Sequence, residues 1–297
     1  MNLLGIDIGA GSIKAGIVDE NGAIIEETNI NTSSSMDNQA FERALKSTVD
    51  FYHRKYKIDG VGVGSPGPID AENGIIFSSA NLPYLDQFPI KTMLKSILNQ
   101  DIFFNNDANC ACLGEYFFGA GKGSQNLFVF TLGTGLGGGW VWKGQLFNGW
   151  EGNGMEVGHT TILKNGAICG CGNRGCAEAY FSATGLINRY FEESKIHLAN
   201  VKDFFDLVRS MDPVAIQILT NGTEILAEAS RNIVNLLNVD TIVFVGGLVQ
   251  SWDLFGDSLE KGIKNKIFPI LRDRLRIRQG KNQAILGAAS LVLEQRR

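Results

Sequence analysis

The sequence predicts an α/β fold, and three observations lead to this prediction. Short β-branched runs alternate with stretches of helical periodicity along most of the 297 residues, which is the pattern of sheets covered by helices. Glycine is abundant, at 36 residues, and it gathers in turns that follow predicted strands. The chain is too long for one small module, so we expect two domains or one large one.

The first three strands form a predicted β-meander. The runs LLGIDIG, SIKAGIVDE and AIIEETN begin at residues 3, 12 and 23, and the turn pair Asn21-Gly22 separates the second from the third. Apolar side chains then recur at helical spacing from Phe41 to Tyr52, which predicts an amphipathic helix over residues 36–56.

The next segments predict two more strands, each followed by a turn. VGVG at 61–64 leads into a Ser-Pro-Gly-Pro loop, and a short helix is expected near 89–99. DIFFNND at 101–107 then runs into a helix over 108–118. The order is therefore strand, sharp turn and helix.

The composition changes near Gly119, where GAGKGSQ is typical of a hinge. Beyond it, residues 126–144 predict two strands joined by a glycine-rich turn, residues 180–237 are mainly helical, and TIVFVGG at 241–247 is a strand. A final helix is predicted from residue 287.

These segments suggest two domains. We predict a smaller N-terminal α/β domain of residues 1–118 plus 288–297, and a larger α/β domain of residues 119–287 that contains a cysteine-rich loop.

Charge and hydropathy exclude several classes of protein. The formal net charge of -4 gives no basic surface for nucleic acid, so a small-molecule partner is expected. No run of 18 apolar residues and no signal peptide are found, which predicts a cytoplasmic protein with no membrane partner. Five cysteines in so long a chain do not form a disulfide framework.

Three glycine-rich turns follow predicted strands: IDIGAGS at 6–12, TLGTGLGGG at 131–139 and FVGG at 244–247. Glycine lets backbone N–H groups approach an anion closely, so such turns can hold phosphates. One such turn would be weak support, but three favour a nucleotide. The sequence has neither a P-loop motif nor a dinucleotide-binding fingerprint.

Asp107 stands in FFNNDANC, at the end of an apolar strand. A carboxylate there could take a proton from a substrate hydroxyl that attacks a phosphoryl group. From the local sequence alone, capping of the following helix is the favoured role, because Asp is common at that position.

A histidine and three cysteines form a candidate metal site in HTTILKNGAICGCGNRGC. His159, Cys169, Cys171 and Cys176 supply one imidazole and three thiolates, a complete tetrahedral set for a structural zinc ion. The alternatives are surface thiols or a disulfide between Cys169 and Cys176.

Two carboxylates flank this loop. Glu156 precedes His159 by three residues, and Glu178 follows Cys176 by two. Separately, either could be a solvated surface charge. Held by a metal-fixed loop, both could bind hydroxyls of a polyol.

Together these motifs resemble the ROK family of bacterial sugar kinases and related repressors. The resemblance spans nearly the whole chain and rests on DIGAGSIKAG, GVGSPGPID, NLP, NNDAN, TLGTGLGGG, EVGH, CGCGNRGC with the following AE, and FVGG, in that order. The pairing of EVGH with CGCGNRGC is the most specific part.

The resemblance implies an actin-like (ribonuclease H-like) sugar-kinase fold, with two α/β domains around a cleft that holds ATP and a hexose. Asp107 then matches the general base that deprotonates the sugar hydroxyl, usually the 6-hydroxyl, for attack on the γ-phosphate. The cofactors implied are ATP, Mg²⁺ and a structural Zn²⁺.

The resemblance also assigns binding positions. Sugar contacts match Asn81, Asn106, Glu156, His159 and Glu178, with Gly67 in a loop beside them. Asp7 matches the acidic residue near Mg²⁺, Gly133, Thr134 and Gly135 match the second phosphate loop, and Gly246 and Gly247 lie on the adenosine side.

The first phosphate loop departs from the family pattern. The family usually has Asp-x-Gly-Gly-Thr, whereas this chain has Asp7-Ile8-Gly9-Ala10-Gly11-Ser12, so the hydroxyl comes one residue later. Lys14 is expected near the phosphates, with orientation into solvent as the alternative.

The expected function is an ATP-dependent hexose kinase, most simply a glucokinase of carbohydrate metabolism, working as a homodimer or tetramer. The alternatives to glucose as the substrate are N-acetylglucosamine, N-acetylmannosamine, mannose and fructose. ATP is preferred over polyphosphate, because polyphosphate-using relatives typically lack the cysteine cluster. A sugar-sensing regulator is disfavoured because the first strand begins at residue 3, with no helix-turn-helix before it. A sugar-binding protein without kinase activity is disfavoured because Asp107 and the glycine loops are retained.

Overall fold

The computed structural model describes residues 1–9, 11–32, 37–77, 82–281 and 283–296. The chain divides into two compact units. The first comprises Met1–Gly123, Gly139–Met155 and Asn282–Arg297, and the second comprises Ser124–Gly138 and Glu156–Lys281.

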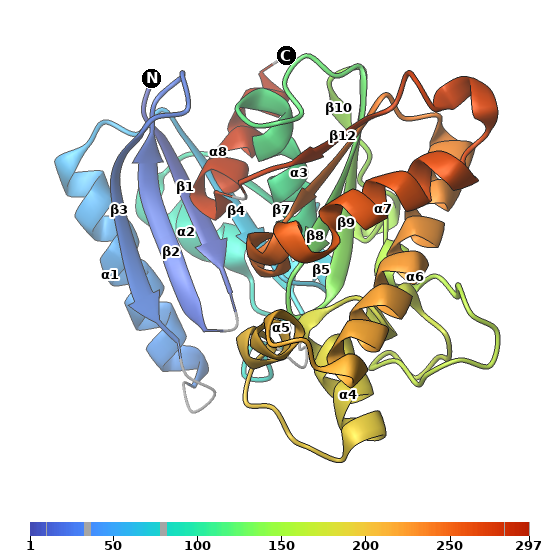
Figure 1. Cartoon of the computed structure of the whole chain (residues 1–297). Coiled ribbons are helices and arrows are strands. Elements are labelled where there is room, and N and C mark those ends of the chain that lie inside the picture. The colour runs from blue at the N-terminus through green and yellow to red at the C-terminus, as the bar shows by residue number, and fades with distance from the viewer. Residues whose placement is uncertain (10, 33–36, 78–81, 282, 297) are drawn as a thin grey trace. The chain divides into compact units, whose positions relative to one another are not determined.

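The first unit is built on a five-stranded sheet with the order β3-β2-β1-β4-β7. Its strands are β1 (Leu3–Ile8), β2 (Ser12–Val18), β3 (Ile24–Asn31), β4 (Gly60–Ser65) and β7 (Ile102–Asn106). The first three pair antiparallel, so the predicted meander is confirmed, whereas β4 and β7 run parallel to β1 (Figure 1).

Helices cover both faces of this sheet. They are α1 (Asn38–Lys55), α2 (Ile90–Leu98), α3 (Asp107–Phe117) and α8 (Ala284–Gln295), and a small hairpin of β5 (Ile69–Asp70) and β6 (Ile75–Ile76) lies among them. The Asp37 side chain caps α1 by accepting a hydrogen bond from the Ala40 N–H at 2.6 Å. The predicted apolar stripe from Phe41 to Tyr52 is buried against the sheet.

Glycines let α8 lie directly on the strands. A Cβ atom added at Gly5 of β1 would lie 2.1 Å from the Ile285 carbonyl oxygen, and one at Gly62 of β4 would lie 1.9 Å from that of Ala288. A larger residue at either position would push the helix away, so these two glycines determine how closely the last helix packs.

A second sheet has the order β10-β9-β8-β11-β12. Its strands are β8 (Asn126–Leu132), β9 (Leu136–Trp142), β10 (Gln145–Leu146), β11 (Thr241–Val245) and β12 (Arg276–Gln279). The predicted pair of strands joined by a glycine turn corresponds to β8 and β9, and β11 lies parallel to β8.

The second unit adds four helices in the part of the chain that the structure describes (Figure 1). They are α4 (Ala183–Ser194), α5 (Val201–Arg209), α6 (Pro213–Leu237) and α7 (Trp252–Lys266). Short 3₁₀ helices occur at η1 (Trp150–Gly152) in the first unit and, in the second, at η2 (Val157–His159), η3 (Ala177–Ala179), η4 (Gly247–Ser251) and η5 (Pro269–Leu271). The sequence did not predict α7 or β12.

The two units differ from the predicted domains in one long segment. Residues 139–155 group with the first unit, whereas the predicted larger domain of 119–287 contained them. Packing explains the difference, because a Cβ atom at Gly139 would lie 2.6 Å from the Cys112 Cβ and 2.9 Å from the Ala108 carbonyl oxygen of α3.

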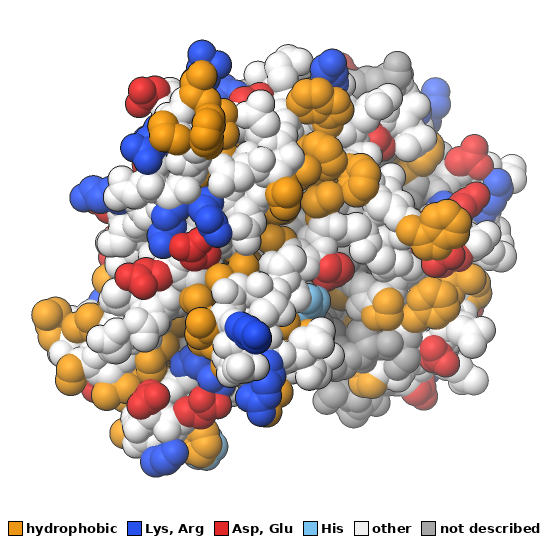
Figure 2. Space-filling model, turned by 90° about the vertical axis from the view of Figure 1, so that its right-hand side faces the viewer, with side chains coloured by type: hydrophobic (Ala, Val, Ile, Leu, Met, Phe, Trp, Pro, Cys, Tyr) orange, Lys and Arg blue, Asp and Glu red, His pale blue; other side chains and the backbone are white. Residues whose placement is uncertain are grey.

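The surface carries charges of both signs. Figure 2 shows Lys and Arg side chains interspersed with Asp and Glu on the displayed face, with hydrophobic groups between them. Among the described residues, no helix is long and apolar enough to cross a membrane.

Candidate active site and metal centre

The parallel strands of the first unit bring Asp7 and Asp107 to one edge of the sheet. Asp7 is paired in register with Gly64, and the neighbouring Ser65 is paired with Asn106, which directly precedes Asp107. The carboxyl ends of parallel strands are where α/β proteins bind ligands. Both predicted acidic residues therefore lie at the same strand ends.

Asn106, and not Asp107, is the N-cap of α3. This corrects the prediction from the local sequence that Asp107 caps the helix. The Asn106 Oδ1 atom accepts a hydrogen bond from the Ala108 N–H at 2.8 Å, and Asp107 is the first helical residue. The Asp107 carboxylate accepts from the same N–H at 2.8 Å. Asp107 is solvent-exposed, so its carboxylate can meet a substrate.

The two carboxylates have raised pKa values. Burial, then repulsion by Asp107, raises the pKa of Asp7 to about 6, and nearby Lys14 partly opposes this rise. The protein atoms packed around Asp107 raise the pKa of its carboxyl as well, although solvent reaches the side chain. Paired acidic groups with raised pKa values are typical of catalytic sites.

The first glycine loop connects β1 and β2 above these carboxylates. The Gly9 N–H donates to the Ser12 carbonyl at 2.8 Å, which closes a tight turn. Lys14 is exposed and lies opposite Asp7 on the neighbouring strand β2. The two predicted phosphate-site residues are therefore cross-strand neighbours.

Thr32 supports this loop, and no sequence motif points to it. The Thr32 N–H donates to the Gly11 carbonyl at 3.0 Å, and its hydroxyl donates to the Gly9 carbonyl at 3.4 Å. Thr32 is buried directly after β3, and this burial is visible only in the structure.

The other predicted sugar positions of the first unit are Gly67 and Asn81. A Cβ atom at Gly67 would lie 3.4 Å from the Asn106 Nδ2 atom, so these two predicted residues are neighbours. Asn81 lies outside the described residues.

In the second unit, the ligand atoms of His159, Cys169, Cys171 and Cys176 all lie within 4.8 Å of one another. The Cys171 and Cys176 sulfurs are 3.7 Å apart, and the Cys169 sulfur is 3.6 Å from the His159 Nδ1. A tetrahedral zinc ion would hold two sulfurs about 3.8 Å apart and a sulfur and a nitrogen about 3.6 Å apart. The four side chains can therefore hold a metal ion.

Local turns assemble this cluster. The Cys169 N–H donates to the Asn173 carbonyl at 2.8 Å and the Gly172 N–H donates back to Cys169 at 3.0 Å, which closes the turn that carries two of the thiols. The Tyr180 hydroxyl accepts from the Ala167 N–H at 2.7 Å and fixes the start of the loop. All five cysteines are free, so the alternative disulfide between Cys169 and Cys176 is not formed.

Two thiols of the cluster differ in acidity. Burial raises the pKa of the Cys169 thiol to about 12. A backbone hydrogen bond from Asn173 lowers the pKa of the exposed Cys171 thiol. A bound divalent cation would overcome the effect of burial and hold the thiolates.

The two predicted carboxylates lie on different sides of His159. Its Nε2 is 4.0 Å from the Glu156 Oε2, and its Nδ1 is 3.8 Å from the Glu178 Oε1. Nδ1 also faces Cys169, so this nitrogen lies on the metal side and Nε2 is left for Glu156 or a ligand.

The second glycine loop, Gly133–Gly135, joins β8 to β9. Gly133 and Gly247 have open space where a Cβ atom would lie, so a ligand can approach their backbones. Gly246 instead packs tightly, with a φ of +107° and an added Cβ only 2.4 Å from the Leu132 carbonyl oxygen. Thr134 is exposed.

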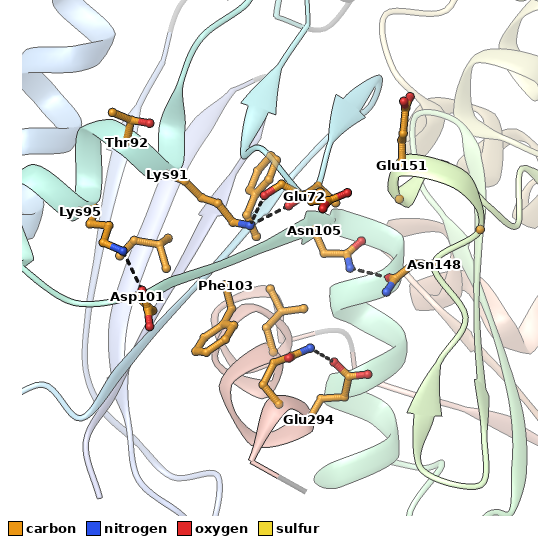
Figure 3. Close-up of a pocket in the computed structure, with 17 residues that line it drawn as sticks. Glu72, Lys91, Thr92, Lys95, Asp101, Phe103, Asn105, Asn148, Glu151 and Glu294 are labelled. Carbon is orange, nitrogen blue, oxygen red and sulfur yellow. Dashed lines mark hydrogen bonds and ion pairs between the residues drawn. The ribbon is translucent and has the colours of Figure 1, made fainter.

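A cavity of about 710 Å³ in the first unit is lined by residues other than the predicted site residues (Figure 3). Lys91 donates from its Nζ to the carbonyls of Ala71 and Glu72, both at 2.8 Å, and Asn105 donates to Asn148 at 2.7 Å. Several of its polar groups thus bond to one another, and none of the predicted site residues lines it. The candidate functional residues are therefore those at the strand ends of the first unit and, separately, those of the metal loop in the second unit.

Comparison with known proteins extends over the whole chain. A sequence model of the ROK family matches residues 3–295. A glucokinase of Thermotoga maritima is 32% identical over 99% of this chain and 98% of its own length. A xylose repressor of Bacillus spizizenii is 29% identical over 98% of this chain and 77% of the repressor.

A solved structure confirms the predicted α/β fold. The ROK family glucokinase from Streptomyces griseus, in complex with glucose and AMPPNP, superposes with a TM-score of 0.82 and 25% identity, covering 100% of both chains.

Proposed function

This chain belongs to the ROK family, and from this premise we propose that it is an ATP-dependent hexose kinase with glucose as its first substrate. The Thermotoga maritima relative is a glucokinase, and the Streptomyces griseus structure holds glucose and an ATP analogue. The observation that carries the proposal is the pair of carboxylates, Asp7 and Asp107, at one edge of the first sheet.

Asp107 is the general base of the proposed reaction. Its carboxylate takes the proton of the sugar 6-hydroxyl while that oxygen forms a bond to the γ-phosphorus of ATP. The bond from the γ-phosphorus to the bridging oxygen breaks, and ADP leaves with the electron pair. A raised pKa makes Asp107 a stronger base than an ordinary aspartate.

Asp7 and the glycine loops have the phosphate-binding roles in this proposal. The Asp7 carboxylate is a hard oxygen ligand suited to Mg²⁺, which would neutralise charge on the transferred phosphoryl group. Gly9, Ser12 and Lys14 face the phosphates from the first loop, and the backbone of Gly133–Gly135 does so from the second. Gly246 and Gly247 lie on the adenosine side.

Polar side chains bind the sugar in this proposal. Asn106, Glu156, His159 and Glu178 bind its hydroxyls, with Gly67 and Asn81 beside them. The Cys₃His cluster binds zinc as a structural ion, because four protein ligands leave no open position. Zinc thus fixes His159 and Glu178 where a sugar hydroxyl can be recognised.

We also propose a cytoplasmic enzyme that works as a homodimer or tetramer. Support for the compartment comes from the five free cysteines, because thiols persist in reducing surroundings.

A coupled assay of ADP release tests the proposed function. Glucose, mannose, fructose, N-acetylglucosamine and N-acetylmannosamine are each offered with ATP, and polyphosphate replaces ATP in a parallel series. We expect turnover of glucose with ATP and little with polyphosphate. Sugar binding without phosphate transfer from ATP would favour a regulator like the xylose repressor relative instead.

A further inference from the structure

Glu178 has its two carboxylate oxygens directed at two different parts of the second unit. Oε2 accepts a hydrogen bond from the Leu136 N–H at 2.9 Å, directly after the second glycine loop. Oε1 lies 3.6 Å from the Cys169 sulfur and 3.8 Å from the His159 Nδ1. One side chain therefore touches both the metal ligands and the phosphate-loop backbone.

We propose that Glu178 is a positioning residue that couples the metal centre to the glycine loop Gly133–Gly135. Metal binding fixes the positions of Cys169 and His159, against which the carboxylate packs, and the carboxylate holds the loop in the shape that receives a phosphate. The inference deepens the proposed function and rests on it in one respect, namely that this loop binds nucleotide phosphates.

The backbone of Glu178 is tied to the same loop by a second route. Its carbonyl accepts from the Ser182 hydroxyl at 2.9 Å, and that hydroxyl accepts from the Gly185 N–H at 2.9 Å to cap α4. The Ala183 N–H at the start of α4 donates to the Gly133 carbonyl at 2.9 Å. Glu178 is therefore connected to the loop twice, by its side chain through Leu136 and by its backbone through Ser182 and Ala183. A shift of Glu178 would move the loop through both connections.

The close contact between Gly135 and Glu178 allows the coupling to be tested by a substitution in the loop. A Cβ atom at Gly135 would lie 2.5 Å from the Glu178 Oε2, which is closer than real Cβ contacts allow. Its backbone needs no left-handed conformation, so alanine can be accommodated if the carboxylate moves. Gly135→Ala therefore displaces Glu178 without altering any metal ligand.

The first experiment measures zinc release from the full chain into a chelating dye. We expect Gly135→Ala to release zinc about tenfold faster than the unsubstituted protein, because the displaced Glu178 carboxylate is pushed against Cys169 and His159 and repels the metal-bound thiolate. Thr134→Ala in the same loop is the matched control, and its release rate should be unchanged. In a Glu178→Ala background, Gly135→Ala should have no additional effect, since the shared partner is gone. Equal release rates for Gly135→Ala and the unsubstituted protein would overturn the inference.

The second experiment measures ADP affinity by calorimetry without sugar. We expect Glu178→Ala to weaken ADP binding about tenfold, and Glu178→Gln by no more than about threefold, because the amide oxygen can still accept from Leu136. Zinc removal from the unsubstituted protein should weaken ADP binding, and ADP should tighten zinc binding by the same factor. A residue that only contacts sugar would leave the ADP affinity of Glu178→Ala unchanged, and that result contradicts the coupling.

The two proposals fail in different ways. If the unsubstituted protein binds no ADP, the kinase assignment fails, while the zinc-release rates still decide whether Glu178 links loop and metal.

Discussion

At the scale of single residues, Asp7 shows how a partly buried carboxylate opposes stability. Folding places its carboxylate in a half-buried site near Asp107, and burial is the main reason that its pKa rises to about 6. A raised pKa means that the folded state disfavours the charged form. Above that pH the charged carboxylate therefore weakens the fold.

We expect Asp7→Asn to raise the free energy of unfolding at pH 8, by up to about 3 kcal/mol, because each unit of pKa shift corresponds to about 1.4 kcal/mol. The gain should fall to about 1 kcal/mol at pH 4.5, where the folded protein already holds the proton. Urea unfolding without nucleotide or Mg²⁺ measures both values, and activity should be lost. Equal stability of the two proteins at pH 8 would show that the burial of this charge has no cost.

The residue types of the site could be predicted from the sequence, but their partners could not. The cysteines and His159 were recognisable by type and spacing, and the structure brings all four together. The capping role was expected for Asp107 and belongs to Asn106, because either side chain suits a helix start and only backbone geometry decides between them. The contact of Glu178 with Leu136 spans 42 residues, so no local pattern indicates it.

At the scale of elements, the contact of α8 with the first sheet depends on glycines in the strands. Gly62 lies so close to the Ala288 carbonyl that an added Cβ would overlap it at 1.9 Å. We expect Gly62→Ala to lower the free energy of unfolding by about 3 kcal/mol, because the helix must move off the sheet.

Gly11→Ala is the control for this substitution, because a Cβ there has open space, and it should change stability by less than about 0.5 kcal/mol. Denaturant unfolding of both variants provides the comparison. Similar stabilities for the two would mean that α8 does not need the close approach.

Strong periodicity explains which elements were predictable. The meander, α1, α2 and the strands next to the glycine turns have clear alternation or helical spacing, and they form where expected. The strand β12 has only four residues, RIRQ, and none is buried, so its composition gave no strand signal. Residues 139–155 group with the first unit because Gly139 meets α3, a tertiary contact that no sequence period encodes.

At the scale of the whole molecule, each unit contributes different chemistry. The first unit holds the paired carboxylates, and the second holds the metal ligands and two of the glycine loops. Metal binding to the second unit adds to its folding free energy, because the ligands are brought together only by folding.

We expect Cys171→Ser to lose most of its zinc and to lower the melting temperature by about 5–10 °C. Cys171 is exposed, so the substitution leaves core packing intact. Cys110→Ala is the control, because this buried thiol lies outside the cluster and its loss should leave one zinc ion per chain. Atomic absorption measures the metal, and full zinc content in Cys171→Ser would exclude this cluster as the site.

The proposed role of Asp107 as the general base of a hexose kinase is tested by the ADP release rate of Asp107→Asn with ATP and glucose. Asp101→Asn is the matched control, because Asp101 precedes the same strand β7 and its side chain is 81% exposed. We predict that kcat of Asp107→Asn falls by about 10²–10⁴ while glucose affinity changes by less than about threefold, and that Asp101→Asn retains full activity. If kcat of Asp107→Asn stays within tenfold of the unsubstituted protein, Asp107 is not the general base.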